Sequence, residues 1–290
     1  MNNRNFLVFI LLLASFLWLN GCVTVYQSNA TPPAPPAPPI PVWAVYFPSP
    51  EIPPNGTIRP IPAYQGWTNL RMERDLARMA EAKFTAALVV TTHLQLLSDE
   101  FLERYRKFAE LAEPHSIQVA LLVRSLTQPA PAMERGNISQ YLSSKGYLDI
   151  PSALRTESGV RILLIDEDFV LDAPSPELDQ TVCIWQIGHE VPALPSGPLD
   201  IPSMRADANG VLWIRAADNS GCAPYNRARP TDDWTIRRRN GAPLKRQLDQ
   251  ARVLNAKLLL LDSWNDYSRG SFVENNTLDQ DALLKLLKNR

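Results

Sequence analysis

Short apolar runs recur along this chain and constrain its fold more than any other feature of its sequence. Each run is five to nine residues long and apolar at most positions, which is typical of a β-strand buried on both faces. We expect seven strands, in residues 41–47, 84–92, 117–123, 160–165, 181–187, 211–216 and 257–261.

Amphipathic segments between the runs predict four or five helices. Ser98 or Asp99 is suited to the N-cap of a helix that ends at Glu113, and Thr277 with Gln280 forms a capping box for the last helix. The expected helices cover residues 70–83, 99–113, 137–145, 243–255 and 278–287.

Buried strands separated by amphipathic helices are typical of parallel strands covered on both faces of the sheet. The order of elements therefore predicts an α/β fold of the (β/α)8, TIM-like barrel type, with some helices in the middle of the chain reduced. The alternative is a doubly wound open sheet. Such sheets often carry a glycine-rich phosphate-binding turn, and the sequence contains none.

The first forty residues predict a location outside the cytoplasm. Arg4 precedes an apolar run at 6–18, and Gly21-Cys22 follows, an order that resembles a bacterial lipoprotein signal peptide. We expect a signal peptide in residues 1–21, lipidation of Cys22, a proline-rich tether in residues 22–40 and one domain in residues 41–290. The alternative is an uncleaved membrane anchor. Val23 after the cysteine resembles outer-membrane cargo, if the source has two membranes.

Charge and cysteine content narrow the classes of partner. The 29 basic and 30 acidic residues give a formal net charge of −1, so we expect no nucleic-acid partner. The sequence has no zinc-type spacing and no dinucleotide or Walker motif, so we expect no metal and no cofactor. Cys183 and Cys222 would form a disulfide in an oxidising compartment, or Cys183 would remain a buried thiol.

Polar and aromatic residues follow the last apolar run, where a core strand would otherwise end in a plain loop. Asp262, Trp264, Asn265, Asp266 and Tyr267 lie here, and in α/β folds the carboxyl ends of strands carry the functional sites. Carboxylates and amides bind sugar hydroxyls, and aromatic faces stack on pyranose rings. We therefore expect Trp264, Asn265 and Tyr267 to contact a glycan.

A longer pattern surrounds this segment. An arginine-rich stretch, an expected helix, the run at 257–261, and then a Trp-Asn-Asp-Tyr-Ser-Arg-Gly motif at 264–270 and the pair Val273-Glu274 occur in that order. The order resembles the glycoside hydrolase family 99-like group, which includes endo-α-mannosidases and WbsX-like proteins. That family has Asn-Glu-Trp-x-Glu-Gly and then an apolar residue with Glu. The first strand, with Tyr46, and Trp67 after it also resemble the family. The resemblance implies a TIM-type barrel that takes a glycan, with Tyr46 and Glu274 among its binding residues.

In the family both glutamates of the motif are catalytic, and this chain departs from the family at both of those positions. Asp266 occupies the first glutamate position and keeps a carboxylate on a shorter side chain. Arg269 occupies the second, and a guanidinium stays protonated, so it would bind a glycan without acting as general acid/base. Either another carboxylate supplies the acid, with Asp166 and Asp168 after the fourth strand as candidates, or the site binds without cutting. Such acids after a strand are often loop or capping residues.

Further strand-end acids, and a histidine with no visible partner, are weaker candidates: Glu167, His189, Glu190 and Asp218. The sequence therefore predicts a lipid-anchored envelope protein whose barrel binds and hydrolyses a glycan. The alternative is a related glycan-binding or scaffold lipoprotein that has lost the chemistry.

Overall fold

A computed structural model gives the fold of the chain. It describes residues 39–49, 60, 61, 63, 66–96, 98–124, 132, 133, 135–166, 169–171, 182–187, 210–216, 241–266, 272–274, 276 and 280–290. These residues belong to a compact unit from Pro39 to Arg290. The expected signal peptide, Cys22 and most of the tether lie outside the described residues.

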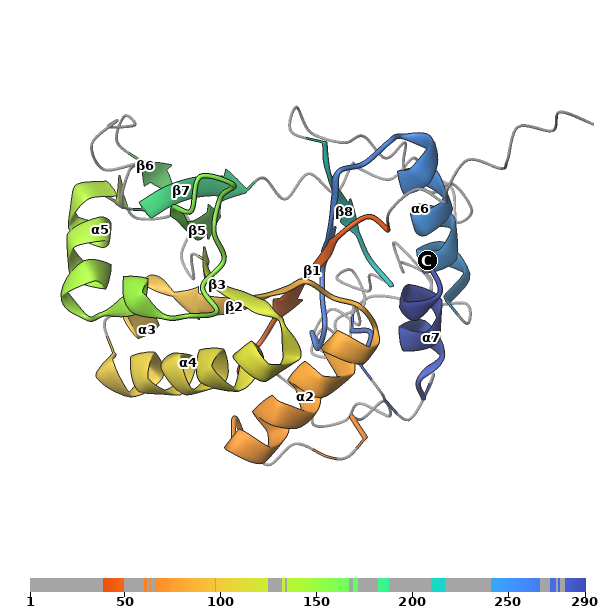
Figure 1. The fold of residues 1–290 in the computed structure, drawn as a ribbon, viewed down its shortest axis with the longest axis horizontal. Coiled ribbons are helices and arrows are strands. Elements are labelled where there is room, and N and C mark those ends of the chain that lie inside the picture. Colours follow the sequence, from red (N-terminus) through yellow and green to blue (C-terminus); the bar gives the residue numbers. More distant parts are fainter. Residues whose placement is uncertain are drawn as a thin grey trace, which may run out of the picture. The chain divides into compact units, whose positions relative to one another are not determined.

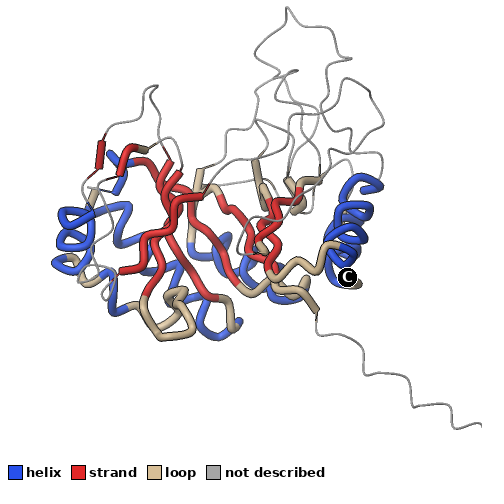
Figure 2. The backbone as a smooth tube through the Cα atoms, turned by 90° about the horizontal axis from the view of Figure 1, so that it is seen from above, coloured by secondary structure: helices blue, strands red, loops and turns tan. Residues whose placement is uncertain are grey.

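Seven parallel strands form one curled sheet, as the sequence predicts (Figures 1 and 2). Their order is β7-β5-β3-β2-β1-β9-β8. They are β1 (Val42–Tyr46), β2 (Ala86–Thr92), β3 (Gln118–Arg124), β5 (Arg161–Asp166), β7 (Val182–Ile187), β8 (Val211–Ile214) and β9 (Leu258–Leu261). A separate pair consists of β4 (Ala132–Met133) and β6 (Val170–Leu171).

The strand order decides between the two expected architectures. The first strand, β1, pairs with the second strand on one side and with the last, β9, on the other. A doubly wound sheet instead reverses its strand order at a switch point. The order found here is the circular order of a barrel. Within the described residues the sheet ends at β7 and β8, so it forms a half-barrel consistent with an incomplete TIM-like barrel.

Curvature of the sheet is evident from a contact across its concave face. Trp43 on β1 stacks on Trp185 of β7, with ring centroids 6.0 Å apart. Three strands separate β1 from β7 in the sheet, a gap of about 19 Å if the sheet were flat. The sheet must therefore curl for the rings to meet. Beside these rings an inner apolar cluster fills the concave face, with Val45, Leu88 and Leu164 among its members.

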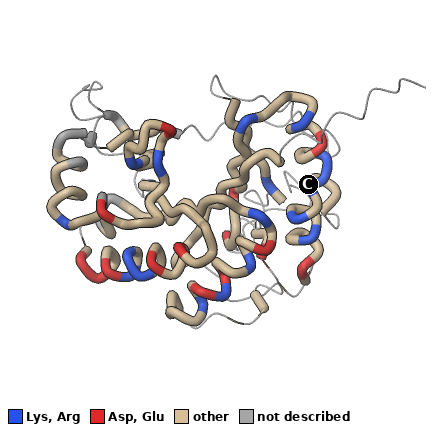
Figure 3. The backbone as a smooth tube through the Cα atoms, viewed as in Figure 1, with Lys and Arg blue, Asp and Glu red and all other residues tan. Residues whose placement is uncertain are grey.

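The helices lie along the convex face and carry most of the charged residues of the described chain, while the strands carry few (Figures 1 and 3). Thr68 and Ser98 cap α2 and α4 by accepting from the backbone N–H three residues later, so the expected Ser98 cap is confirmed. None of the described helices is long and apolar enough to cross a membrane. The helices are α2 (Asn69–Glu81), α3 (His93–Leu96), α4 (Asp99–Ala112), α5 (Arg135–Ser144), α6 (Ala242–Val253) and α7 (Ala282–Lys288), with 3-10 turns at Glu113–His115 and Tyr147–Asp149.

The start of the last helix differs from its prediction. The capping box placed the start at residue 278, but α7 begins at Ala282 and has no side-chain cap at Asp281. Gln280 has a left-handed φ of 52°, and its backbone exchanges two hydrogen bonds with Asn276. This small bridge uses the backbone groups that a helix start would need. The Thr277 part of the prediction lies outside the described residues.

Candidate functional site

Charged side chains form the uppermost layer of the concave face. Arg124 ends β3, Arg215 follows β8, and Asp262 follows β9, so all three lie at the carboxyl ends of their strands. Side chains alternate between the faces of a strand, which places each of them on the face of the residue two positions earlier. Those earlier residues belong to the inner apolar cluster or pack on it: Leu122, Trp213 and Leu260.

The three side chains converge, and we name them the arginine–aspartate cluster. Arg215 donates from Nε and Nη2 to Oδ2 of Asp262, over 2.9 Å and 2.6 Å. Arg124 Nη2 lies 3.8 Å from the other oxygen, Oδ1. Asp262 is 0% exposed, so solvent screens these contacts little. On the backbone of Arg215, the amide of Gln247 in α6 accepts from the N–H and donates to the carbonyl. Arg215 is thus fixed at both ends.

Phe47, just after β1, completes this layer with an aromatic face. The Arg124 guanidinium lies 5.4 Å from the centre of the Phe47 ring, within the range of a cation–π contact. Asn265 holds the Phe47 backbone, because its Oδ1 accepts from Phe47 N–H and its Nδ2 donates to the Phe47 carbonyl, both at 2.8 Å. Arg71 Nη2 donates to the same carbonyl. Phe47 is therefore anchored from both sides.

Asn265 and Trp264, which are expected from the sequence to contact a sugar, are both buried, and their sugar contacts stay predictions. The Asn265 amide is buried and joins the end of β9 to the end of β1. Trp264 is 0% exposed, and Phe84 packs edge-on against it at 5.8 Å. The chain turns inward after β9, since Trp264 N–H donates to the Val45 carbonyl. In this structure Trp264 is a core residue, and it offers no ring face to solvent.

Tyr46, which the family resemblance places among the binding residues, packs against helices, and its binding role stays a prediction. It alternates with Phe47 and therefore points away from the concave face, toward α2 and α4. It is fully buried, stacks on Phe108 at 4.9 Å and donates to Asp75 Oδ2 at 3.1 Å. Burial is the main cause that raises the pKa of Tyr46, and the carboxylates of Asp75 and Glu274 add to it. Tyr46 supports the strand from the helix side.

The carboxylates of the last motif are enclosed. Asp266 is 5% exposed, and its backbone N–H donates to Ser263 Oγ at 2.8 Å. The peptide bond between Asp262 and Ser263 is cis. Glu274 is buried and its N–H donates to the Trp264 carbonyl. Both acids thus lie near Trp264, and their catalytic and binding roles stay predictions.

Of the remaining predicted site residues, the structure describes Asp166. Asp166 is the last residue of β5. Because Val123 pairs with Ile165 in parallel register, Asp166 lies at the same edge of the sheet as Arg124. The other residues proposed from the sequence lie outside the described residues: Glu167, Asp168, His189, Glu190, Asp218, Tyr267 and Arg269.

Sequence reasoning missed the arginine–aspartate cluster and singled out only Asp262 among its three members. The available signal was the spacing: each charged residue stands two positions after an apolar strand residue of the concave face, so alternation alone would have placed all three inward.

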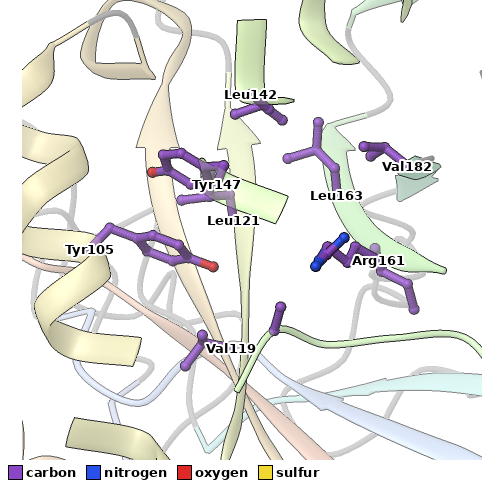
Figure 4. A pocket seen from close by; sticks show the side chains of 10 residues that line it. Tyr105, Val119, Leu121, Leu142, Tyr147, Arg161, Leu163 and Val182 are labelled. Atoms are coloured by element: carbon purple, nitrogen blue, oxygen red, sulfur yellow. The ribbon is translucent and has the colours of Figure 1, made fainter. Parts of the chain in front are cut away.

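Two hollows lie elsewhere in the described part of the chain. One, of about 20 Å³, lies among Tyr105, Tyr147 and Arg161 (Figure 4), and it has room for about one water molecule, not for a sugar. Another, of about 300 Å³, lies between α2 and α7 and is lined mainly by charged side chains such as Arg78 and Lys285. Within the described part of the chain, no group of three or more His, Cys, Asp or Glu residues is arranged to hold a metal ion.

Solved structures of other proteins have a similar fold. The GH99 endo-alpha-mannosidase from Bacteroides thetaiotaomicron is similar with a TM-score of 0.56 and 12% identity, over 85% of this chain and 95% of that chain. A second structure, described as a glycoside hydrolase-like protein, has a TM-score of 0.57 and 14% identity, over 88% of this chain and 96% of that chain.

The chain has a glycoside-hydrolase-like fold. No family model and no curated protein matches its sequence, so the similarity concerns the fold. In TIM barrels, active sites lie at the carboxyl ends of the strands. The arginine–aspartate cluster occupies that edge in this glycoside-hydrolase-like fold.

Proposed function

We propose that this protein binds a glycan at the carboxyl ends of β1, β3, β8 and β9. The observation that carries the proposal is the arginine–aspartate cluster beside Phe47. It sets fixed hydrogen-bond donors and an aromatic ring together at the edge of a glycoside-hydrolase-like barrel. Hydroxyl-rich ligands are recognised by such polar groups in preorganised positions.

Hydrolysis of the glycan is a second candidate function, favoured by the carboxylate at Asp266. Glycosidases generally use two carboxyl groups about 5–10 Å apart across the scissile bond. Asp262 is a poor candidate for either, because Arg215 already binds its carboxylate through two donors. Asp266, in the segment after β9, is the first candidate, and Asp166 at the end of β5 or Asp168 two residues later would supply the second carboxyl group. Without a working pair the protein is a glycan-binding or scaffold protein.

A screen that measures binding and reducing-end release in the same wells tests both functions. The purified chain is incubated with envelope polysaccharides and oligosaccharides, beside the Asp266→Asn variant. For an enzyme that uses Asp266, the variant should lose about a hundredfold or more of the release rate, with an unchanged thermal midpoint. Unchanged release would remove Asp266 from catalysis, and binding without release would identify a binding protein. If no glycan binds or is cut, the proposed function is wrong.

We further propose that the protein is a lipid-anchored component of the cell envelope, outside the cytoplasm. The support is the sequence alone, in which an apolar segment ends at Gly21-Cys22 before a proline-rich tether. Cys22→Ser removes the thiol that would carry the lipid, so the protein should move from the membrane fraction to the soluble fraction or keep its signal peptide. Unchanged mature mass and unchanged membrane retention would contradict lipidation. Asn20→Ala is a control that leaves the thiol in place.

A further inference from the structure

Trp185 is an exposed aromatic residue on the inner face of the barrel sheet. It lies in β7, where its neighbour Ile184 belongs to the apolar core on the helix side and Cys183 packs on the inner apolar cluster. Side chains alternate between the faces of a strand, so Trp185 points toward the concave face. It is nevertheless 37% exposed, at a position where a core strand would carry a packed residue.

Trp185 differs from the other exposed apolar residues of the described chain. Single aliphatic residues at a protein surface are common and need no ligand to explain them. An indole ring inside the curve of a sheet is a different case, because aromatic side chains provide the largest apolar areas for contact with a ligand. The other large apolar residues that are exposed within the described ranges are aliphatic and lie outside the sheet: Ile61, Leu70, Val253 and Leu254.

Trp43 of β1 supports the Trp185 ring from one side. The two rings stack with their centroids 6.0 Å apart and their planes inclined by 23°. Trp43 itself packs on the inner apolar cluster and is only partly buried. Stacked aromatic pairs contribute beyond the area they bury, so the contact holds the Trp185 ring in place while part of it stays accessible to solvent.

The ring pair lies one layer below the arginine–aspartate cluster. Trp43 pairs in register with Leu260, and Asp262 follows Leu260 by two residues on the same face. Two residues along a strand correspond to about 7 Å. A ligand in the concave face would therefore meet aromatic rings and, about one layer higher, fixed polar groups.

Aromatic rings one layer below polar groups match the chemistry of a sugar chain. A pyranose presents C–H groups on its ring face, which pack on an aromatic ring, and hydroxyl groups at its edge, which need polar partners. A purely apolar ligand would leave the polar layer without a use, and a flat protein surface would not reach into a concave face. Because the layers are about 7 Å apart, stacking and hydrogen bonding fall to different sugar residues of one chain.

We propose that Trp185, supported by Trp43, is an aromatic platform for one sugar ring of an oligosaccharide whose neighbouring sugar reaches the arginine–aspartate cluster. This inference rests on the proposed function. It adds a binding residue on β7 to the site at the strand ends, and it narrows the ligand from glycans in general to chains of at least two sugars.

A series of oligosaccharides of increasing length tests the inference on the unaltered protein. Chains of one to about six sugars, prepared from mannan, dextran and cellulose, are titrated by calorimetry. In at least one series the affinity should rise about tenfold or more between one sugar and three, which corresponds to about 1.4 kcal/mol of added contact. A single sugar that binds as tightly as the longer chains would overturn the inference and leave glycan binding in place.

Substitutions of Trp185 connect the gain in affinity to its ring. Trp185→Ala removes the platform and should reduce the affinity for the longer chains about tenfold or more, whereas Trp185→Tyr keeps an aromatic face and should give an intermediate value. Leu70→Ala is the matched control, because Leu70 is 78% exposed in α2 on the convex face. It should leave the affinity unchanged. Thermal unfolding of each variant checks that it folds.

Protection from oxidation tests the platform without a variant. N-bromosuccinimide oxidises accessible tryptophan side chains, and mass spectrometry of peptides locates the product. With the oligosaccharide at about ten times its Kd, oxidation of Trp185 should slow about tenfold, because only about a tenth of the protein remains unbound. Trp264, at 0% exposed, should react slowly with or without the sugar. Unchanged oxidation of Trp185 in the complex would overturn the inference, even if Trp185→Ala does not fold.

The outcomes separate this inference from the proposed function. Full affinity of a folded Trp185→Ala variant would overturn the platform and leave glycan binding at the strand ends in place. Protection of Trp185 that increases with protein concentration in the absence of sugar would also overturn it, since a second copy of the chain would then cover the ring. Absence of binding to every glycan would overturn the proposed function itself.

Discussion

Asp262→Asn is expected to lower the free energy of unfolding by about 3–5 kcal/mol, the typical loss when one partner of a buried ion pair is removed. Asp262 is 0% exposed and accepts two hydrogen bonds from Arg215. In the variant, Arg215 stays protonated, but the neutral amide at position 262 no longer compensates its charge in this buried position.

Urea unfolding followed by circular dichroism measures this loss. Asp249→Asn is the matched control, because Asp249 is an exposed carboxylate that also contacts two cations, Lys245 and Arg252. Exposed pairs contribute little to stability, so the control should unfold at the same urea concentration as the unaltered protein. A loss below about 1 kcal/mol for Asp262→Asn, the level of an exposed pair, would mean that the cluster is solvated.

Trp264→Ala is expected to cost about 3–5 kcal/mol of stability, as for other large aromatic residues removed from a core. The ring is 0% exposed and packs edge-on against Phe84 at 5.8 Å. Alanine would leave a cavity beside Phe84. The backbone of Trp264 also forms hydrogen bonds with Val45, Val273 and Glu274. The cavity would therefore weaken the packing that holds Asp266 and Glu274 in place.

Trp264→Phe separates packing from recognition. It keeps an aromatic ring in the core and removes the indole N–H, which has no hydrogen-bond partner among the residues that the structure describes. We expect it to lose about half as much stability as Trp264→Ala, or less. If Trp264→Ala instead kept full stability and lost glycan affinity, the Trp264 ring would contact the sugar, as the sequence pattern predicts. That result would contradict its role as a core residue.

The strands were predictable from the sequence because each is apolar on both faces. Runs such as 84–92 and 257–261 agree with β2 and β9 to within two residues. The start of α7 was not predictable in the same way. Gln280 suits a capping box by residue type, but its backbone bonds to Asn276 in a bridge that depends on the fold of the preceding loop.

Site residues were harder to predict, because a polar side chain at a strand end can bind either a ligand or another part of the protein. Asn265 has the residue type of a sugar ligand, yet its amide binds the backbone of Phe47, 218 residues earlier. Arg215 and Asp262 are 47 residues apart and meet only through the parallel register of β8 and β9. Local sequence indicates that such residues gather at one edge, and the register decides which of them bind each other.

A crystal structure of the protein with a glycan identified by the screen tests the central claim most directly. We expect the sugar at the carboxyl ends of β1, β3, β8 and β9, with its oxygens within hydrogen-bond distance of Arg124 or Arg215 and its ring near Phe47. A sugar bound instead in the hollow between α2 and α7, beside Arg78 and Lys285, would contradict the assignment of the site to the strand ends.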